Sequence, residues 1–289
     1  MKGDAVMKGK DRASTDRFFG SEFHDAEVTC GADQYINLGF SYMERECYRE
    51  AEKCFVQVVD LESENPEACN NLGYLYEKMG RLSNARALYQ RALRLDPMNA
   101  EAMINLAHIR EREGDYFGAI IQYENAALFD HTGVRARFCL AVCYDRHDMF
   151  DEAMRIYRDV LDRDPYHRKA LFNMGNLCVQ VGNYEEAREM LERFLELVPE
   201  NSEAWNNIGS LYEEMGDVEQ AQTAWKRSVD LNPFQKEANL NLARLHYFLW
   251  KSGACDIGKG DIGARLEFVL SLDPENQQAE RLLEKFQRD

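Results

Sequence analysis

The sequence predicts an all-α fold, an α-solenoid of helical hairpins, and three observations support this class. A residue pair whose second member is small returns every 34 residues, another small residue follows it downstream, and a proline closes most of the periods. A fixed period of roughly 20–50 residues is typical of repeat arrays, in which each unit packs only against its neighbours. We therefore expect one continuous array and no single large core.

The period divides residues 32–276 into seven windows: 32–65, 66–99, 100–133, 134–167, 168–201, 202–235 and 236–276. The residue pair is Leu38-Gly39, Leu72-Gly73, Leu106-Ala107, Leu140-Ala141, Met174-Gly175, Ile208-Gly209 and Leu242-Ala243. The second small residue is Ala51, Ala85, Ala119, Ala153, Ala187 or Ala221, and four residues later come Phe55, Tyr89, Tyr123, Tyr157, Leu191 or Trp225. The closing prolines are Pro97, Pro165, Pro199, Pro233 and Pro274.

Each window should form two helices joined by a turn. In the second window the spacing i, i+3, i+4, i+7 of one helical face is occupied by Cys69, Leu72, Gly73 and Tyr76. We expect Gly73 to be small because two helix backbones approach each other there. Turn glycines follow the first helix in most windows, whereas Glu46 and Asp148 take that place in the first and fourth windows, where we expect less regular turns.

This pattern resembles the tetratricopeptide repeat (TPR), whose signature has an aromatic residue, a Leu-Gly pair, a Tyr, an Ala, an aromatic residue and a Pro in this order. The resemblance covers residues 32–276 and implies a right-handed α-solenoid, or superhelix, of seven TPR helical hairpins. It also implies a protein that binds other proteins and is no enzyme, although a fold alone does not transfer a function.

The two ends of the chain depart from the pattern. Residues 277–289 place Ala279, Leu282, Leu283 and Phe286 on one stripe, which predicts a C-terminal cap helix that solvates the end of the array. Residues 1–31 mix charges with Gly and Ser, and we expect a mostly disordered tail. The apolar residues Phe18, Phe19 and Phe23 interrupt it and would form a short extra helix, dock on the array or join a second protomer.

The side of the first helix opposite its packing stripe should line a concave groove. At the sixth place of six windows stand asparagines, namely Asn37, Asn71, Asn105, Asn173, Asn207 and Asn241. A carboxamide can bind the backbone of an extended peptide whatever its side chains. The row is similar to the asparagine ladder in the repeat domain of O-linked N-acetylglucosamine transferase; alternatively, each amide bonds only a neighbouring helix.

Other places on the same side predict pockets for client side chains. Phe138, Val142 and Phe172 supply apolar groups, and Arg135 and Lys169 supply positive charge in the middle of an otherwise acidic face. Exposed apolar groups in a row indicate a partner. We expect a protein or peptide client that is apolar with basic flanks and an acidic centre; merely solvated charges are the alternative.

Composition narrows the possible partners. The chain has 51 acidic and 35 basic residues, a net charge of -16, which repels nucleic acid and anionic lipid. No apolar stretch is long enough to span a membrane, and the start lacks the apolar core of a signal peptide. We therefore expect a cytoplasmic protein with neither nucleic acid nor membrane as partner. The eight cysteines lack the spacing of a disulfide framework.

Two chemical patterns are weak. The stretch from Gly253 to Gly260 spells G-x4-G-K of a phosphate-binding loop without its Ser or Thr, so an insertion near residues 249–260 is the preferred interpretation. Cys139, Cys143 and His147 lie at i, i+4 and i+8 on one helical face, but no fourth metal ligand is evident. We expect no metal ion, no cofactor and no catalytic residues.

The sequence therefore predicts a non-catalytic adaptor or scaffold that holds an extended peptide segment in its groove. The alternative is a structural scaffold that self-assembles into homo-oligomers through the N-terminal tail or the repeat ends.

Overall fold

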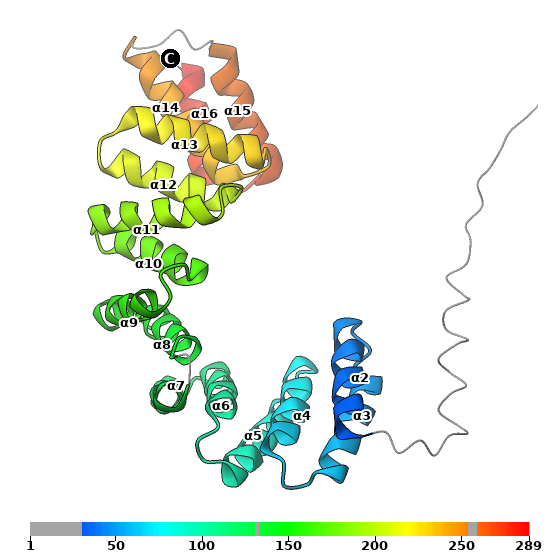
Figure 1. Cartoon of the computed structure of the whole chain (residues 1–289). Helices are drawn as coiled ribbons and strands as arrows, with labels where there is room; N and C mark the ends of the chain where they lie inside the picture. The colour runs from blue at the N-terminus through cyan, green and yellow to red at the C-terminus, as the bar shows by residue number, and fades with distance from the viewer. Residues whose placement is uncertain (1–30, 131–132, 254–258, 289) are drawn as a thin grey trace, which may run out of the picture. The chain divides into compact units, whose positions relative to one another are not determined.

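A computed structural model of the chain describes residues 31–130, 133–253 and 259–288. The regular structure in these ranges consists of fifteen helices, which confirms the predicted all-α class (Figure 1). The tail residues Phe18, Phe19 and Phe23 lie outside the described residues, as do residues 254–258 of the expected insertion. The described chain divides into two compact units, one ending at Leu95 and the other beginning at Asp96.

The first unit contains two consecutive helical hairpins. Helix α2 (Ala32–Glu44) packs against α3 (Tyr48–Leu61), which packs against α4 (Pro66–Lys78), and α4 packs against α5 (Leu82–Leu95). The core of this unit is apolar and includes the buried side chains of Ala51, Phe55, Val58, Leu72 and Leu75.

The second unit continues the same pattern of sequential hairpins. Its helices are α6 (Ala100–Arg112), α7 (Tyr116–Phe129), α8 (Arg135–Arg146), α9 (Phe150–Arg163), α10 (Arg168–Gln180), α11 (Tyr184–Leu197), α12 (Ser202–Glu214), α13 (Val218–Leu231), α14 (Lys236–Lys251), α15 (Lys259–Leu272) and α16 (Gln277–Arg288). Each helix packs on its neighbours in sequence, and each even-numbered helix from α6 to α14 also contacts the next even-numbered one. This consecutive packing is that of an α-solenoid.

Helix α16 ends the array as expected of a cap. Its Ala279 and Phe286 are buried against Ile262 and Leu266 of α15, whereas most of its other side chains are polar and exposed. The last apolar face of the stack is therefore covered by a helix whose outer side is compatible with water.

Local chemistry explains where many helices begin. The side chains of Asn65, Asn99 and Asn201 accept hydrogen bonds from backbone amides of α4, α6 and α12. Asp115 and Asp217 do the same for α7 and α13. Because the first amides of a helix lack partners within it, such caps stabilise the helix by about 1 kcal/mol each.

Where the small residue of the repeated pair is glycine, it makes room for a large side chain of the second helix and not for a second backbone. A Cβ atom added to Gly73 would lie 2.7 Å from the Tyr89 ring, and one added to Gly209 would lie 2.6 Å from the Trp225 ring. Gly39 faces Phe55 and Gly175 faces Leu191 in the same way. In each case the large residue comes from the second helix of the hairpin, sixteen positions later. This interlock explains why both features return with the period.

The turns at Glu46 and Asp148 are as regular as those with glycine, so the expectation of irregular turns is wrong. Both residues adopt a φ of 58°, in the left-handed region that glycine occupies at Gly80. The Asp148 amide donates to the Asp145 carbonyl and the Met149 amide to the Tyr144 carbonyl, matching the bonds from Gly80 to Glu77 and from Arg81 to Tyr76. Backbone hydrogen bonds therefore fix the turn even where the residue type disfavours it.

We expect Gly73→Leu to destabilise the first unit. Leu favours a helix over Gly by about 1 kcal/mol, but its side chain would overlap the fully buried Tyr89 ring, and overpacking of this kind costs about 3 kcal/mol or more. Urea unfolding followed by circular dichroism measures the difference. Ala87→Leu, on the exposed side of α5, is the matched control and should change stability by at most about 0.5 kcal/mol. Equal stability of the two variants would show that Gly73 does not have to make room for the Tyr89 ring.

We also expect Asp148→Gly to stabilise the second unit by about 0.5–1 kcal/mol, because glycine adopts the left-handed conformation without the steric penalty of a Cβ atom. Asp148→Ala separates this effect from the loss of the carboxylate, since alanine keeps the Cβ atom. Thermal unfolding should show a higher midpoint for the glycine variant than for the alanine variant. The same midpoint for both would show that backbone strain is not the cause.

Candidate functional site

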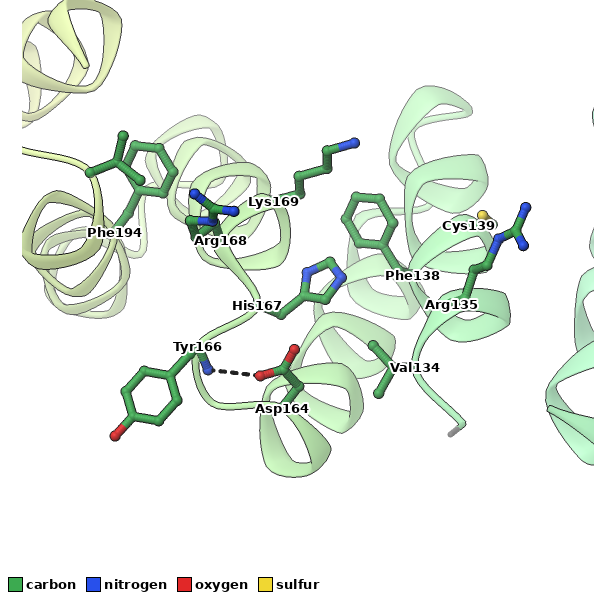
Figure 2. A pocket seen from close by; sticks show the side chains of 11 residues that line it. Val134, Arg135, Phe138, Cys139, Asp164, Tyr166, His167, Arg168, Lys169 and Phe194 are labelled. Atoms are coloured by element: carbon green, nitrogen blue, oxygen red, sulfur yellow. Dashed lines mark hydrogen bonds between the residues drawn. The ribbon is translucent and has the colours of Figure 1, made fainter. Parts of the chain in front are cut away.

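Three of the predicted site residues, Arg135, Phe138 and Lys169, line one cavity in the second unit (Figure 2). Its volume is about 950 Å³, and it lies between α8, α10 and the C-terminal part of α11. The other lining residues are Val134, Cys139, Asp164, Tyr166, His167, Arg168, Phe194 and Val198. Because α8 and α10 are first helices of successive hairpins, their second places lie side by side at the cavity.

The cavity has an aromatic wall. The half-buried ring of Phe138 lies 4.8 Å from the ring of His167, measured between centroids. Phe172 contacts Phe194, a lining residue, at 5.0 Å. Val142 is half-buried one turn beyond Phe138 on α8. Such a wall can take up an apolar or aromatic side chain of a partner.

The rim of the cavity is basic. Arg168 and Lys169 are exposed and have neither an ion pair nor a side-chain hydrogen bond to any residue that the structure describes. Arg135 pairs with Glu101 at 2.9 Å, but both side chains are more than half exposed, and pairs of this kind contribute at most about 1 kcal/mol. Arg135 can therefore exchange this partner for another carboxylate. The lining contains one acid, Asp164, which accepts a hydrogen bond from the Tyr166 amide.

His167 combines two roles at the cavity. Its Nδ1 accepts a hydrogen bond of 3.1 Å from the Ala170 amide and so caps α10, the task that Asn65, Asn99 and Asn201 perform in other windows. Burial lowers the pKa of His167 from its ordinary value. The ring must be unprotonated at Nδ1 to accept this bond, so capping and charge at the cavity are coupled.

The asparagines of the sixth place bond neighbouring side chains in the second unit. Asn173 donates to the Tyr157 hydroxyl at 3.3 Å, and Asn207 donates to Asn176 at 2.9 Å. Asn241 donates to Asn206 at 3.2 Å, and Asn206 in turn donates to Asn207. These contacts favour the alternative interpretation, in which the amides tie helices together. They leave part of the hydrogen-bonding capacity of each carboxamide unused.

The remaining asparagines of this row differ in exposure. Asn105 is only 4% exposed, so it offers almost no surface to a client. Asn37 is exposed and Asn71 is half-buried, and both lie in the first unit. The row is therefore not uniform.

A second cavity, of about 820 Å³, includes Asn207 from the row of asparagines at the sixth place. It is lined by Ser202, Glu203, Asn206, Asn207, Asn232, Phe234, Gln235, Lys236, Glu237 and Leu272. Lys236 is paired with Asp273 at 2.9 Å, whereas Glu203 and Glu237 occupy the second place of their windows. The same places that are basic at α8 and α10 are thus acidic at α12 and α14.

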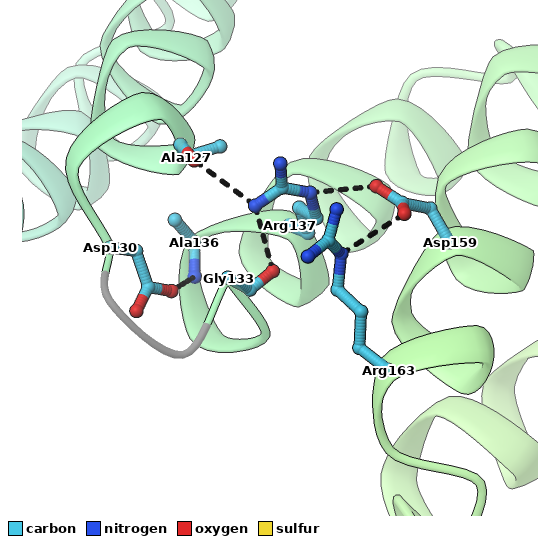
Figure 3. Close-up of polar contacts among 7 residues, drawn as sticks. All are labelled: Ala127, Asp130, Gly133, Ala136, Arg137, Asp159 and Arg163. Carbon is cyan, nitrogen blue, oxygen red and sulfur yellow. Dashed lines mark hydrogen bonds and ion pairs between the residues drawn. The ribbon is translucent and has the colours of Figure 1, made fainter.

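Sequence reasoning missed the contacts of Arg137, which joins α8 to α9 and to the end of α7 (Figure 3). Its guanidinium donates to Asp159 at 2.6 Å and to the backbone carbonyls of Ala127 and Gly133, while Arg163 donates to the other oxygen of Asp159. Gly133 precedes the lining residue Val134. The signal was present, because an arginine here replaces the mostly apolar residues at the fourth place of the other windows, Tyr35, Cys69, Met103, Leu171, Trp205 and Asn239.

Comparison with known proteins agrees with the fold. Residues 103–231 match the family model of the cilia and flagella-associated protein 70 middle TPR-like domain, and residues 66–99 match that of the tetratricopeptide repeat. No curated protein matches the sequence. Within the described residues, no helix has the length and apolar character needed to cross a membrane.

Solved structures show the same architecture at low identity. YrrB, described as a TPR protein with an unusual peptide-binding site, is 20% identical over 64% of this chain and 95% of its own, with a TM-score of 0.55. PilF of Pseudomonas aeruginosa is 18% identical over 72% of this chain and 94% of its own, with a TM-score of 0.63. A chain of the APC/C hetero-tetramer Cut9–Hcn1 is 18% identical over 90% of this chain and 50% of its own, with a TM-score of 0.61.

Together, the helical hairpins, the family models and these structures identify the chain as a tetratricopeptide repeat protein. Proteins with this fold are generally non-catalytic scaffolds, and the fold suggests a protein–protein interaction adaptor.

We expect His167→Asn to reduce the acid sensitivity of the second unit. The folded state binds the His167 proton less tightly than the unfolded chain, because burial lowers the folded pKa. Stability is therefore fully present above the unfolded pKa of about 6.5 and is lost as the pH falls through the lower folded pKa. Asparagine keeps the cap without titrating, so urea unfolding at pH 7 and pH 5 should differ less for this variant than for the wild type.

His167→Ala distinguishes the cap from the charge. It removes both, so it should lower stability by about 1 kcal/mol at pH 7 while also weakening the pH dependence. An unchanged pH dependence in His167→Asn would show that other groups, such as His246, whose pKa is also lowered by burial, dominate the acid response.

Proposed function

We propose that this protein is a non-catalytic adaptor that holds an extended segment of a client protein on the even-numbered helices of its second unit. The observation that carries the proposal is the cavity between α8 and α10. It combines three exposed cations with an aromatic wall in a chain whose net charge is -16. A cavity with this lining suits an apolar or aromatic side chain next to carboxylates.

The charged residues along the same face indicate the charge pattern of the rest of the client segment. The second place of the window is Arg135 and Lys169 at α8 and α10, and Glu203 and Glu237 at α12 and α14. A complementary segment is acidic and apolar where it crosses α8 and α10, and basic where it crosses α12 and α14. This agrees with the basic flank and acidic centre expected from the sequence.

The asparagines at the sixth place are proposed to bind the backbone of the client segment. Asn173 and Asn207 each donate one hydrogen bond to a side chain of the protein, and Asn241 donates to both Asn206 and Ser210. A carboxamide has two N–H donors and two acceptor lone pairs, so capacity remains for the backbone of a client. The peptide-binding site for which YrrB is described supports this use of the fold. We also propose that this protein is cytoplasmic.

Self-assembly has less support from the described residues. The outer side of α16 is polar, which disfavours stacking of one C-terminal end on another copy. The N-terminal residues that would mediate assembly in this alternative lie outside the described part of the chain.

Fluorescence anisotropy with two labelled synthetic peptides tests the proposal. One peptide has alternating Glu and Phe followed by a Lys-rich end, and the other has Lys in place of Glu and Glu in place of Lys. We expect the wild type to prefer the first peptide. The double variant Arg135→Glu, Lys169→Glu should bind it at least about tenfold more weakly, a difference of about 1.4 kcal/mol.

The control reverses the same number of charges elsewhere in the second unit. Arg281→Glu, Lys285→Glu changes two exposed cations of α16 and should leave the affinity within about twofold at physiological salt, where distant exposed charges are screened. Equal loss in both double variants would show an effect of net charge alone. Equal binding of the two peptides by the wild type would refute the proposed client chemistry.

A further inference from the structure

Cys143 stands at a place where the windows from the second to the seventh otherwise have a branched aliphatic residue. The tenth place of the later windows is Leu75, Ile109, Leu177, Leu211 and Leu245, all of them in the core. Cys143 is likewise fully buried, but its side chain is smaller and carries a sulfur atom. A metal-binding role would explain this exchange, because a thiolate is a strong zinc ligand.

Two further ligand groups meet the sulfur of Cys143. They are the carboxylate of Glu111, from α6, and the imidazole of His147, which follows α8 directly. One ligand atom from each of the three residues lies within 4.8 Å of the other two. Cys143 and His147 are four residues apart, so they project from one side of α8. The spacing of Cys139, Cys143 and His147 gave only a weak metal pattern and led us to expect no metal ion; the structure places Glu111, and not Cys139, beside Cys143 and His147.

Neighbouring side chains orient these ligands. The Tyr123 hydroxyl donates a hydrogen bond of 2.5 Å to Oε2 of Glu111, which leaves Oε1 for another partner. The ring of His147 lies against the ring of Tyr116, with centroids 3.7 Å apart. Outer contacts of this kind hold metal ligands in place and are a regular part of metal sites.

One cation lies near the cluster. Arg146 approaches Oε1 of Glu111 at 3.7 Å, but its side chain is 68% exposed, whereas that of Glu111 is only 14% exposed. The arginine can therefore turn into water when an ion takes its place, at the small cost of a surface ion pair. Glu111 cannot leave the cluster as easily.

We propose that Glu111, Cys143 and His147 bind one zinc ion, with water as the fourth ligand. A tetrahedral ion with the usual bond lengths places its ligand atoms roughly 3.3–3.6 Å apart, so these side chains need to close by about 1.5 Å at most. Sulfur, imidazole and carboxylate together suit zinc better than calcium or magnesium, which prefer oxygen alone. The thiol proton passes to water when the sulfur binds the metal.

Such an ion would join successive hairpins next to the proposed binding cavity. Glu111 belongs to the hairpin of α6 and α7, and Cys143 and His147 to that of α8 and α9. Cys139, one turn before Cys143 on α8, lines the cavity. The zinc site would therefore fix the position of α8 on α6. This inference stands on residues that the proposed peptide contacts do not use, so either can fail without the other.

Titration of the metal-free protein with Co²⁺ tests the site. Tetrahedral cobalt bound to a thiolate gives a charge-transfer band in the near ultraviolet and stronger visible bands than aqueous cobalt. We expect both to saturate at one ion per chain and to disappear when Zn²⁺ is added in excess. The thermal midpoint of the chelator-treated protein should rise when Zn²⁺ is restored.

Two variants test individual ligands, and a third is the control. Cys143→Leu restores the residue type of the other windows, so it should fold and lose the charge-transfer band. His147→Gln, at a partly exposed position, should weaken cobalt binding at least about tenfold. Cys139→Ser is the matched control, a cysteine one turn away on the same helix, and should bind like the wild type.

The opposite results overturn the proposal. A band that survives in Cys143→Leu, or that is lost in Cys139→Ser, places the metal elsewhere. The absence of a band in the folded wild type at millimolar Co²⁺ shows that the three groups are a hydrogen-bonded cluster and no metal site. If Cys143→Leu does not fold, unchanged cobalt binding by His147→Gln decides against the site.

Discussion

In the four hairpins whose repeated pair ends in glycine, the packing depends on the contact between this glycine of the first helix and a large side chain of the second. At Gly39, Gly73, Gly175 and Gly209 even one added carbon atom would overlap the opposing side chain. This contact sets how closely the two helices approach, and the interior of a protein adjusts poorly to added volume. It also fixes which side of the first helix remains uncovered by its own hairpin. The predicted binding residues of the second unit lie on the first helices of its hairpins.

The sequence predicted the architecture well because its period reports packing. Small and large residues at fixed places must recur when the same two helices pack repeatedly, so residue types alone locate each hairpin. Arg135, Phe138 and Lys169 line one cavity because successive first helices lie side by side. The turn at Asp148 was misjudged because residue preference is a weaker constraint than the backbone hydrogen bonds of the turn.

The sequence alone did not reveal which side chains on other helices each polar residue contacts. The place of Asn207 follows from the period, but its bond to Asn176 depends on side-chain conformations that a period does not contain. The contacts of Arg137 with Asp159, and the approach of Glu111 to Cys143, likewise join residues 22 and 32 positions apart. Pattern reasoning identified the face of the helix, and three-dimensional contacts decided what each polar group on that face does.

The interlocking residues and the charged residues of the binding face occupy different places of the window. Arg135, Lys169, Glu203 and Glu237 share the second place, which is exposed or half-exposed and takes no part in the contact between the glycine and the large side chain. Charge there can consequently change sign from one hairpin to the next while the architecture stays the same. A scaffold whose packing residues and binding residues are separate can acquire a preference for a new client by successive single substitutions, each of which leaves the protein folded. The same substitutions are open to protein engineering.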